Sequence, residues 1–161
     1  MPVPDGHACR PFLGSALLAI LVLCGGCLTS TQSLFTASGP GWHVRTGQAL
    51  WRPGRQRPEV GGELVMASHE DGRNLIQFDK TPLSLVSAQT TPTRWLIQFP
   101  PRQMGFSGHG PGPTRFAWLY LPAALAGEPL PPPLRFERNP DGGWRLENPR
   151  TGETLEGFLD P

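Results

Sequence analysis

The residues whose side chains could do chemistry are few and far apart in this sequence. His43, His69 and His109 are separated by 26 and 40 residues, with no second ligand at metal-binding spacing. Glu70 and Asp71 are adjacent acids in a turn-like stretch, where solvated charges are the simpler interpretation. No serine stands in a Gly-x-Ser-x-Gly elbow. The sequence therefore predicts no catalytic residue, no metal and no cofactor, and the protein is not expected to be an enzyme.

One cysteine does stand in a context that implies chemistry. An apolar run of 11 residues, 13–23, is followed by Cys24-Gly25-Gly26-Cys27. The run is too short to cross a membrane, which takes about 20 residues, but it suits a secretory signal. Lipoprotein processing cuts before a cysteine that follows small residues, so we expect a signal peptide over 1–26 and a lipid on Cys27. An ordinary cleaved signal, with Cys27 as an incidental thiol, is the alternative.

Cleavage before Cys27 would leave a single cysteine in the mature chain. Cys9 and Cys24 would be removed with the signal, so no disulfide is expected within the domain. The residue after Cys27 is Leu28 rather than Asp, which favours the outer membrane under the sorting rule of enteric bacteria. We therefore expect a protein anchored at the periplasmic face of the outer membrane, with membrane lipid as its partner through the anchor.

Composition and charge exclude some classes of protein. The 14 basic and 13 acidic residues are scattered, and Arg52, Arg55 and Arg57 form the only close basic group. A nucleic-acid-binding protein would normally carry a basic stripe, so no nucleic-acid partner is expected. Long helices are disfavoured by 20 glycines and 20 prolines, which predict a turn-rich chain.

The pattern along the chain predicts a polar, flexible tether over 27–40 and one β-rich domain over 41–161. Period-two alternation and turn residues such as Asp71-Gly72 indicate strands, and Pro122 with Gly127 brackets a short helix. We expect a mainly β (α+β) fold, either a strongly curved antiparallel sheet or an incomplete β-barrel with one or two short helices. The expected strands are 42–50, 63–68, 74–78, 83–89, 94–99, a short piece around 106–107, 134–138, 144–147 and 153–159.

Large apolar side chains are the most prominent feature of the expected strands. Five tryptophans and several phenylalanines could simply fill the core. A curled sheet with few helices could instead leave its concave side open, and some rings would then line a groove for an apolar ligand. Both interpretations stay open. The candidate groove residues are Trp42, Phe78, Trp95, Ile97, Phe99, Trp118, Phe136 and Trp144.

The order of these features resembles the LolB-type outer-membrane lipoprotein receptors. The resemblance rests on the lipidated cysteine, the strand that carries Trp42, a Pro-Leu loop, a short helix and the final strands around Gly143-Trp144. It implies an open half-barrel whose cavity holds acyl chains, and a function in receiving lipoproteins from a periplasmic carrier. In that family a protruding leucine in the Pro-Leu loop helps to insert acyl chains, which makes Pro82 and Leu83 the corresponding candidates.

Two functions remain open at this point. In the first, the domain binds acyl chains and helps to receive or insert lipoproteins. In the second, it is a non-enzymatic structural or protein-binding lipoprotein with a filled core, which offers a sheet edge to a partner. Two roles are likewise open for Leu83. It could contact the membrane, or it could simply be the first apolar residue of the next strand.

Overall fold

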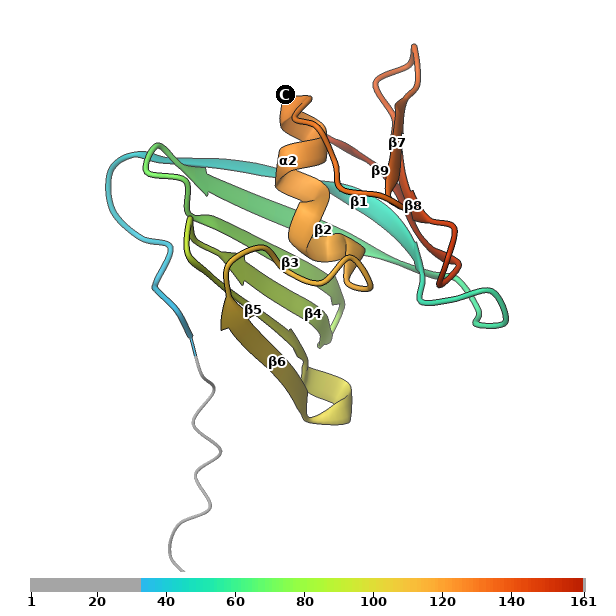
Figure 1. The fold of residues 1–161 in the computed structure, drawn as a ribbon, viewed down its shortest axis with the longest axis horizontal. Helices are drawn as coiled ribbons and strands as arrows, with labels where there is room; N and C mark the ends of the chain where they lie inside the picture. Colours follow the sequence, from blue (N-terminus) through green and yellow to red (C-terminus); the bar gives the residue numbers. More distant parts are fainter. Residues whose placement is uncertain (1–32, 161) are drawn as a thin grey trace, which may run out of the picture. The chain divides into compact units, whose positions relative to one another are not determined.

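The computed structural model describes residues 33–160 and shows them forming one antiparallel sheet of nine strands (Figure 1). The predicted signal peptide and Cys27 lie outside the described residues. The strands are β1 (Trp42–Arg52), β2 (Val60–His69), β3 (Asn74–Lys80), β4 (Leu83–Thr90), β5 (Arg94–Phe99), β6 (Met104–His109), β7 (Arg135–Arg138), β8 (Trp144–Asn148) and β9 (Glu153–Leu159). Their order in the sheet is β6-β5-β4-β3-β2-β1-β9-β8-β7, so the sheet is not closed into a barrel. The prediction of a mainly β, antiparallel domain with a short helix is confirmed.

The helical part of the chain lies between β6 and β7. A 3-10 turn, η2 (Ala117–Tyr120), runs directly into the single α-helix of the described residues, α2 (Leu121–Ala126), and a second 3-10 turn, η1 (Pro100–Arg102), connects β5 to β6. Proline near the start of α2 and Gly127 after its end delimit the helix as expected, and Gly127 has φ of 78°. The short apolar helix is thus set by local sequence.

Two glycines allow β1 and β9 to approach each other closely. β1 pairs with β2 along almost its whole length but with β9 only over Gly47–Arg52. A Cβ atom at Gly47 would overlap the carbonyl oxygen of Phe158, and one at Gly157 would overlap the carbonyl oxygen of Gln48. Only glycine fits at these two positions, which join the first six strands to the last three.

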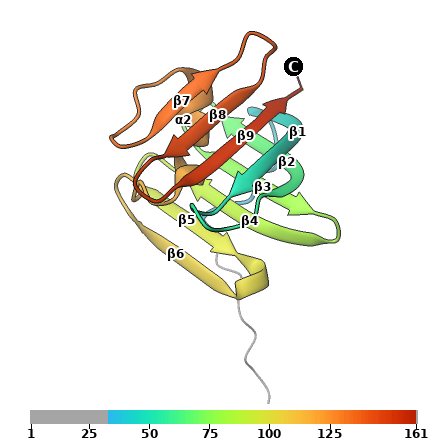
Figure 2. The ribbon, with the colours of Figure 1, turned by 90° about the vertical axis from the view of Figure 1, so that its right-hand side faces the viewer.

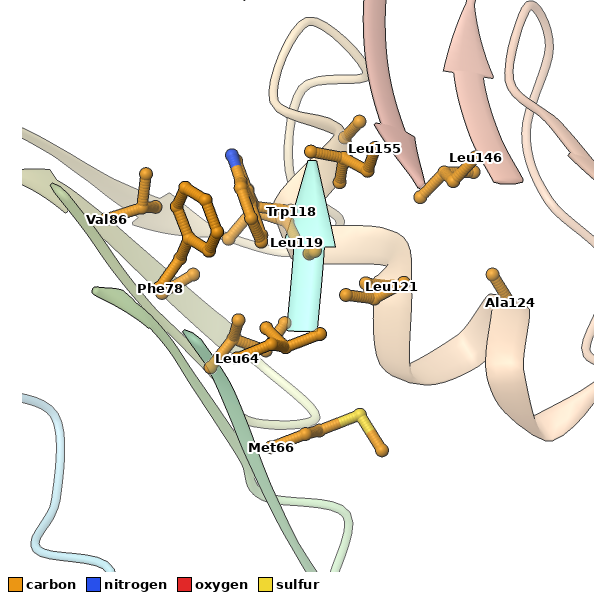
Figure 3. Packing of buried hydrophobic residues seen from close by; sticks show 14 of the residues in the cluster. Leu64, Met66, Phe78, Val86, Trp118, Leu119, Leu121, Ala124, Leu146 and Leu155 are labelled. Atoms are coloured by element: carbon orange, nitrogen blue, oxygen red, sulfur yellow. The ribbon is translucent and has the colours of Figure 1, made fainter. Parts of the chain in front are cut away.

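The hydrophobic core lies on one face of the sheet, around η2 and α2. Trp118, Leu121 and Ala124 are fully buried and follow one another at helical spacing. Figure 3 shows Phe78 and Val86 beside Trp118, while Leu146 and Leu155 reach the same cluster from β8 and β9. In Figure 2, α2 lies behind β7 and β8, on the side that faces the remaining strands. The helical segment therefore fills the inner side of the sheet.

The opposite face of the sheet is covered in part by residues 33–40. Gln89 points away from the core, because its neighbour Ala88 belongs to the core cluster and side chains alternate along a strand. The backbone N–H of Leu34 donates to Gln89 Oε1 at 2.6 Å, and Gln89 Nε2 donates to the carbonyl of Phe35 at 3.2 Å. The last part of the predicted tether is therefore bound to β4. Its first part, 27–32, lies outside the described residues.

Candidate functional site

Four of the eight candidate groove residues are core residues. Phe78, Ile97, Trp118 and Trp144 are buried in the cluster around η2 and α2. The ring centroid of Trp118 lies 5.1 Å from that of Phe78 and 5.8 Å from that of Trp51. At these positions the inner side of the sheet is occupied by side chains of the protein itself.

The other four candidates are partly buried, and one of them lies on the opposite face of the sheet from the rest. Trp95, Phe99 and Phe136 pack against the edge of the core cluster. Trp42 stacks on Phe35 at 5.5 Å, next to the segment that crosses the opposite face of the sheet. The eight candidates therefore do not line one common groove in the part of the chain that the structure describes.

A shallow hollow lies where the inner face reaches the surface beside β1 and β5. It has a volume of about 250 Å³ and is lined by Trp51, Leu85 and Phe99, with Arg57 and Arg102 at its rim. The rings of Trp51 and Phe99 are stacked with centroids 6.0 Å apart. Small-molecule pockets usually enclose about 300–1,000 Å³, so this hollow is small for a whole ligand.

His69 and Asp71, two of the residues considered for chemistry, interact within the turn after β2. His69 Nδ1 lies 2.9 Å from Asp71 Oδ1, and Arg73 Nε donates to Asp71 Oδ2 at 2.8 Å. Desolvation opposes ionisation of Asp71, but hydrogen bonds from the Arg73 backbone and from the His69 and Arg73 side chains hold its pKa below the usual value. The Arg73 guanidinium in turn lies 5.3 Å from the centroid of the Trp42 ring. His69, Asp71 and Arg73 thus contact other residues of the protein in ways that shape the turn.

Leu83 is exposed at the start of β4. Thr81 and Pro82 form the turn between β3 and β4, and Leu83 is the first residue of the strand that follows. Its side chain is 57% exposed, so it begins the strand without joining the core. The residue is thus available for contact with a membrane or a partner.

Glu153 is a buried carboxylate that the sequence reading did not single out. It is 5% exposed, and its two oxygens accept hydrogen bonds of 3.0 Å from Trp51 Nε1 and from the backbone N–H of Ala117. Burial raises the pKa of Glu153 to about 7, although the two hydrogen bonds oppose that shift. Both oxygens are occupied by groups of the protein, so Glu153 fastens η2 to the sheet. Its position at the start of a strand after a glycine turn gave no signal of this role.

The two edges of the sheet differ in their side chains. β6 carries no Lys, Arg, Asp or Glu, and all its residues are exposed except the half-buried Gly108. Phe106 is 37% exposed and its ring centroid lies 5.1 Å from that of Phe116. β7 has four residues, of which Arg135, Glu137 and Arg138 are charged.

Within residues 33–160, no helix is long and apolar enough to cross a membrane. The same residues contain no group of three or more histidine, cysteine or acidic side chains that could hold a metal ion. No protein-family model matches the chain, and no curated protein matches it either.

Proposed function

We propose that this protein is a lipid-anchored, non-enzymatic lipoprotein of the outer membrane that binds a partner protein along the free edge of β6. The observation that carries the proposal is the contrast between a filled interior and an edge strand that has no charged residue of its own. The remaining support comes from the anchor motif at Cys27 and from the position of the first residues bound to the domain.

The filled interior favours protein binding over the burial of whole acyl chains. Trp118 and Leu121 occupy the space that a half-barrel carrier would leave open, and they pack against Leu64 and Phe78. A bound acyl chain would have to displace them, and opening such a core costs several kcal/mol. Apolar side chains of the protein already supply the contacts that an acyl chain would make.

The β6 edge has the properties of a strand that accepts another strand. Among the described strands only β5 pairs with β6, so alternate backbone N–H and C=O groups of its six residues point outward. Natural edges of this kind are usually blocked by charge, proline, a bulge or a covering segment, because unpaired edges bind other chains. An extended partner segment would complete these hydrogen bonds and could rest an apolar side chain against Phe106.

The anchor would hold the domain close to the lipid surface. Ser33, the first described residue, already contacts Gln89 of the sheet, and it stands six residues after Cys27 in the sequence. Six residues reach about 20 Å even when fully extended. A domain held this close to the membrane would meet other proteins of the same surface, for which low intrinsic affinity suffices because the local concentration is high.

A second candidate function is contact with acyl chains during lipoprotein insertion, as the resemblance to LolB-type receptors implies. The observation that favours it is the exposure of Leu83 directly after Pro82. It also needs the finer architecture that the sequence predicts, a strongly curved sheet close to an open half-barrel. The hollow beside Trp51 and Phe99 would then be the place where part of an apolar chain enters.

Site-specific crosslinking in the native cell envelope tests the main proposal. A photoreactive amino acid would replace Ser107 in β6 or, as the matched control, Glu137 in β7. We expect one discrete protein adduct from position 107 and none from position 137. Equal adducts from both edges, or none from either, would contradict the proposal.

A labelled triacyl lipopeptide added to the purified protein tests the second candidate. That candidate predicts that the protein binds the lipopeptide with or without Leu83→Glu. It also predicts that transfer of the lipopeptide to vesicles is lost in the Leu83→Glu variant.

A further inference from the structure

A groove of about 590 Å³ lies on the outer face of β1, β2 and β9, away from the core and from the β6 edge. Leu50 and Phe158 are 48% and 46% exposed beside it, whereas their neighbours Ala49 and Leu159 are buried in the core. Alternation along the strands therefore puts Leu50 and Phe158 on the outer face. The volume falls within the range of about 300–1,000 Å³ that ligand sites occupy.

The strand register arranges the groove as two rows of side chains. One row crosses four strands as Phe158, Gln48, Glu63 and Asp79, each opposite the next. The neighbouring row contains Glu156, Leu50 and Gly61. The apolar side chains thus lie toward β9, and the acidic pair Glu63 and Asp79 lies toward β3.

Glycine at position 61 keeps the centre of the groove open. Gly61 lies opposite Leu50, and a Cβ atom there would come within 3.3 Å of Leu50 Cδ2. Gly62 is tighter still, because its Cβ would overlap the Asp79 carbonyl oxygen. A side chain at position 61 would fill the hollow between Leu50 and Glu63, whereas one at position 62 would disturb the strands.

Two acidic side chains lie side by side in the groove, and one of their oxygens lacks a hydrogen-bond donor among residues 33–160. Glu63 and Asp79 face each other directly across β2 and β3, and like charges in that arrangement are destabilising. Asp79 Oδ1 is buried, and no hydrogen-bond donor within residues 33–160 reaches it. Lys80 is the only basic residue of the lining, and Glu156 is already paired with Arg145. An added cation that lies beside both carboxylates would relieve the repulsion between Glu63 and Asp79.

We infer that this groove binds an extended segment of a partner protein in which a lysine or arginine lies beside a bulky apolar residue. The cationic side chain would bridge Glu63 and Asp79, and the apolar one would cover Leu50 and Phe158. A free metal ion would meet the acidic pair but leave the exposed apolar residues bare. The inference goes beyond the proposed function, because it uses a different surface from β6 and a defined side-chain chemistry.

Peptide display against the full-length, lipidated protein in detergent micelles tests this inference. We expect the enriched peptides to carry Arg or Lys next to Leu, Ile or Phe, and their synthetic copies to bind in a fluorescence anisotropy assay. Asp79→Asn removes the charge with little change of shape, and Gly61→Val fills the hollow without changing any charge. Each variant should weaken binding at least about tenfold, while Glu137→Gln, on β7 and outside the lining of the groove, should leave it unchanged.

Three outcomes of the peptide experiments would overturn the inference. They are the absence of any enriched peptide, enrichment of peptides without a basic residue, and binding that survives both Asp79→Asn and Gly61→Val. Calcium chloride titrated alone is the further arm, and saturable calcium binding that excludes the peptides would assign the acidic pair to a metal instead. Thermal unfolding of each variant confirms that it is folded before its binding is measured.

Discussion

The interior of this domain and its β6 edge differ in burial and in hydrogen bonding. Inside, Trp118, Leu121 and Glu153 are enclosed by the sheet, and both oxygens of Glu153 have donors. At β6 the side chains are exposed, and one side of the backbone lacks a neighbouring strand among the described residues. The difference separates the region that stabilises the domain from the edge that we propose as a binding surface. Substitutions inside should change the free energy of unfolding, and substitutions at β6 should change partner binding.

The largest effect on stability is expected for Trp118→Ala. The side chain is fully buried beside Phe78, so its removal should lower the free energy of unfolding by about 3–5 kcal/mol. Urea unfolding followed by tryptophan fluorescence or circular dichroism measures this loss. Trp118→Phe should cost clearly less, because Trp118 Nε1 is buried without a partner among the described residues and phenylalanine removes that unpaired donor.

The matched control for Trp118 is Trp42→Ala, on the other side of the sheet. Trp42 is only half-buried and contacts Phe35 and His69. Trp42→Ala should therefore lower the free energy of unfolding by less than Trp118→Ala does. Equal losses for the two tryptophans would mean that the interior is not the main source of stability, and the contrast with the β6 edge would lose its basis.

The second effect is a pH dependence that Glu153 introduces. Its pKa is raised from the ordinary 4.5 to about 7, mainly by burial, so the folded protein retains a proton that the unfolded chain releases. The contribution of Glu153 to stability is therefore greatest below about pH 4.5 and is lost as the pH rises to about 7. The full difference is roughly 3 kcal/mol.

Glu153→Gln should remove this slope, since glutamine does not titrate. Unfolding free energies of the wild type and the variant at pH 4.5, 5.5 and 7 measure it as a difference, in which the other titrating groups cancel. Glu137→Gln, at an exposed position in β7, is the control and should keep the wild-type slope. A slope that Glu153→Gln leaves intact would contradict the role of Glu153 in the interior.

A smaller effect is expected at the tip of the β3–β4 turn. Leu83→Glu should change the free energy of unfolding by no more than about 0.5 kcal/mol, because the side chain is largely exposed. Val86→Glu, three residues along the same strand, would bury a charge in the core and should prevent folding. Vesicle flotation of the folded Leu83 variant then separates membrane contact from stability. Unfolding by Leu83→Glu would show that this leucine supports the core after all.

The smallest effect on stability, and the largest on binding, is expected at β6. Ser107→Lys places a charge on the exposed edge, which natural sheets use to block pairing with other strands. Stability should stay within about 0.5 kcal/mol, whereas recovery of the crosslinked or copurified partner should fall at least about tenfold. Glu137→Lys makes the matched change on β7. Loss of the partner from the β7 variant instead would reverse the assignment of the edges.

Much of the fold could be predicted because local sequence decides strands and turns. The alternation of Trp95, Ile97 and Phe99 correctly indicated one inward face of β5, and Asp71-Gly72 correctly marked the turn after β2. Pro122 and Gly127 correctly bracketed the helix. The short piece around 106–107 proved to be a six-residue strand, Met104–His109. Its two glycines made the segment look irregular in the sequence.

The parts that could not be predicted depend on contacts between distant segments. Alternation identified β1 as a strand but did not say which side faces the core. Val44 and Leu50 are exposed, while the small Ala49 is buried, because β2 and β9 place their core residues on that side. Sequence spacing likewise gave no sign that Trp118 fills the inner side of the sheet or that Glu153 fastens it there.

Amide hydrogen exchange along β6 tests the central claim most directly. The same protein would be measured after purification in detergent and in outer-membrane vesicles that retain its natural neighbours, with exchange followed for peptides from β6, β7 and β8. The account predicts slower exchange in the vesicles for the peptides that cover Met104–His109, while β8, already paired on both sides, stays unchanged. Exchange at β6 that is equally fast in both preparations, or protection confined to β7, would contradict it.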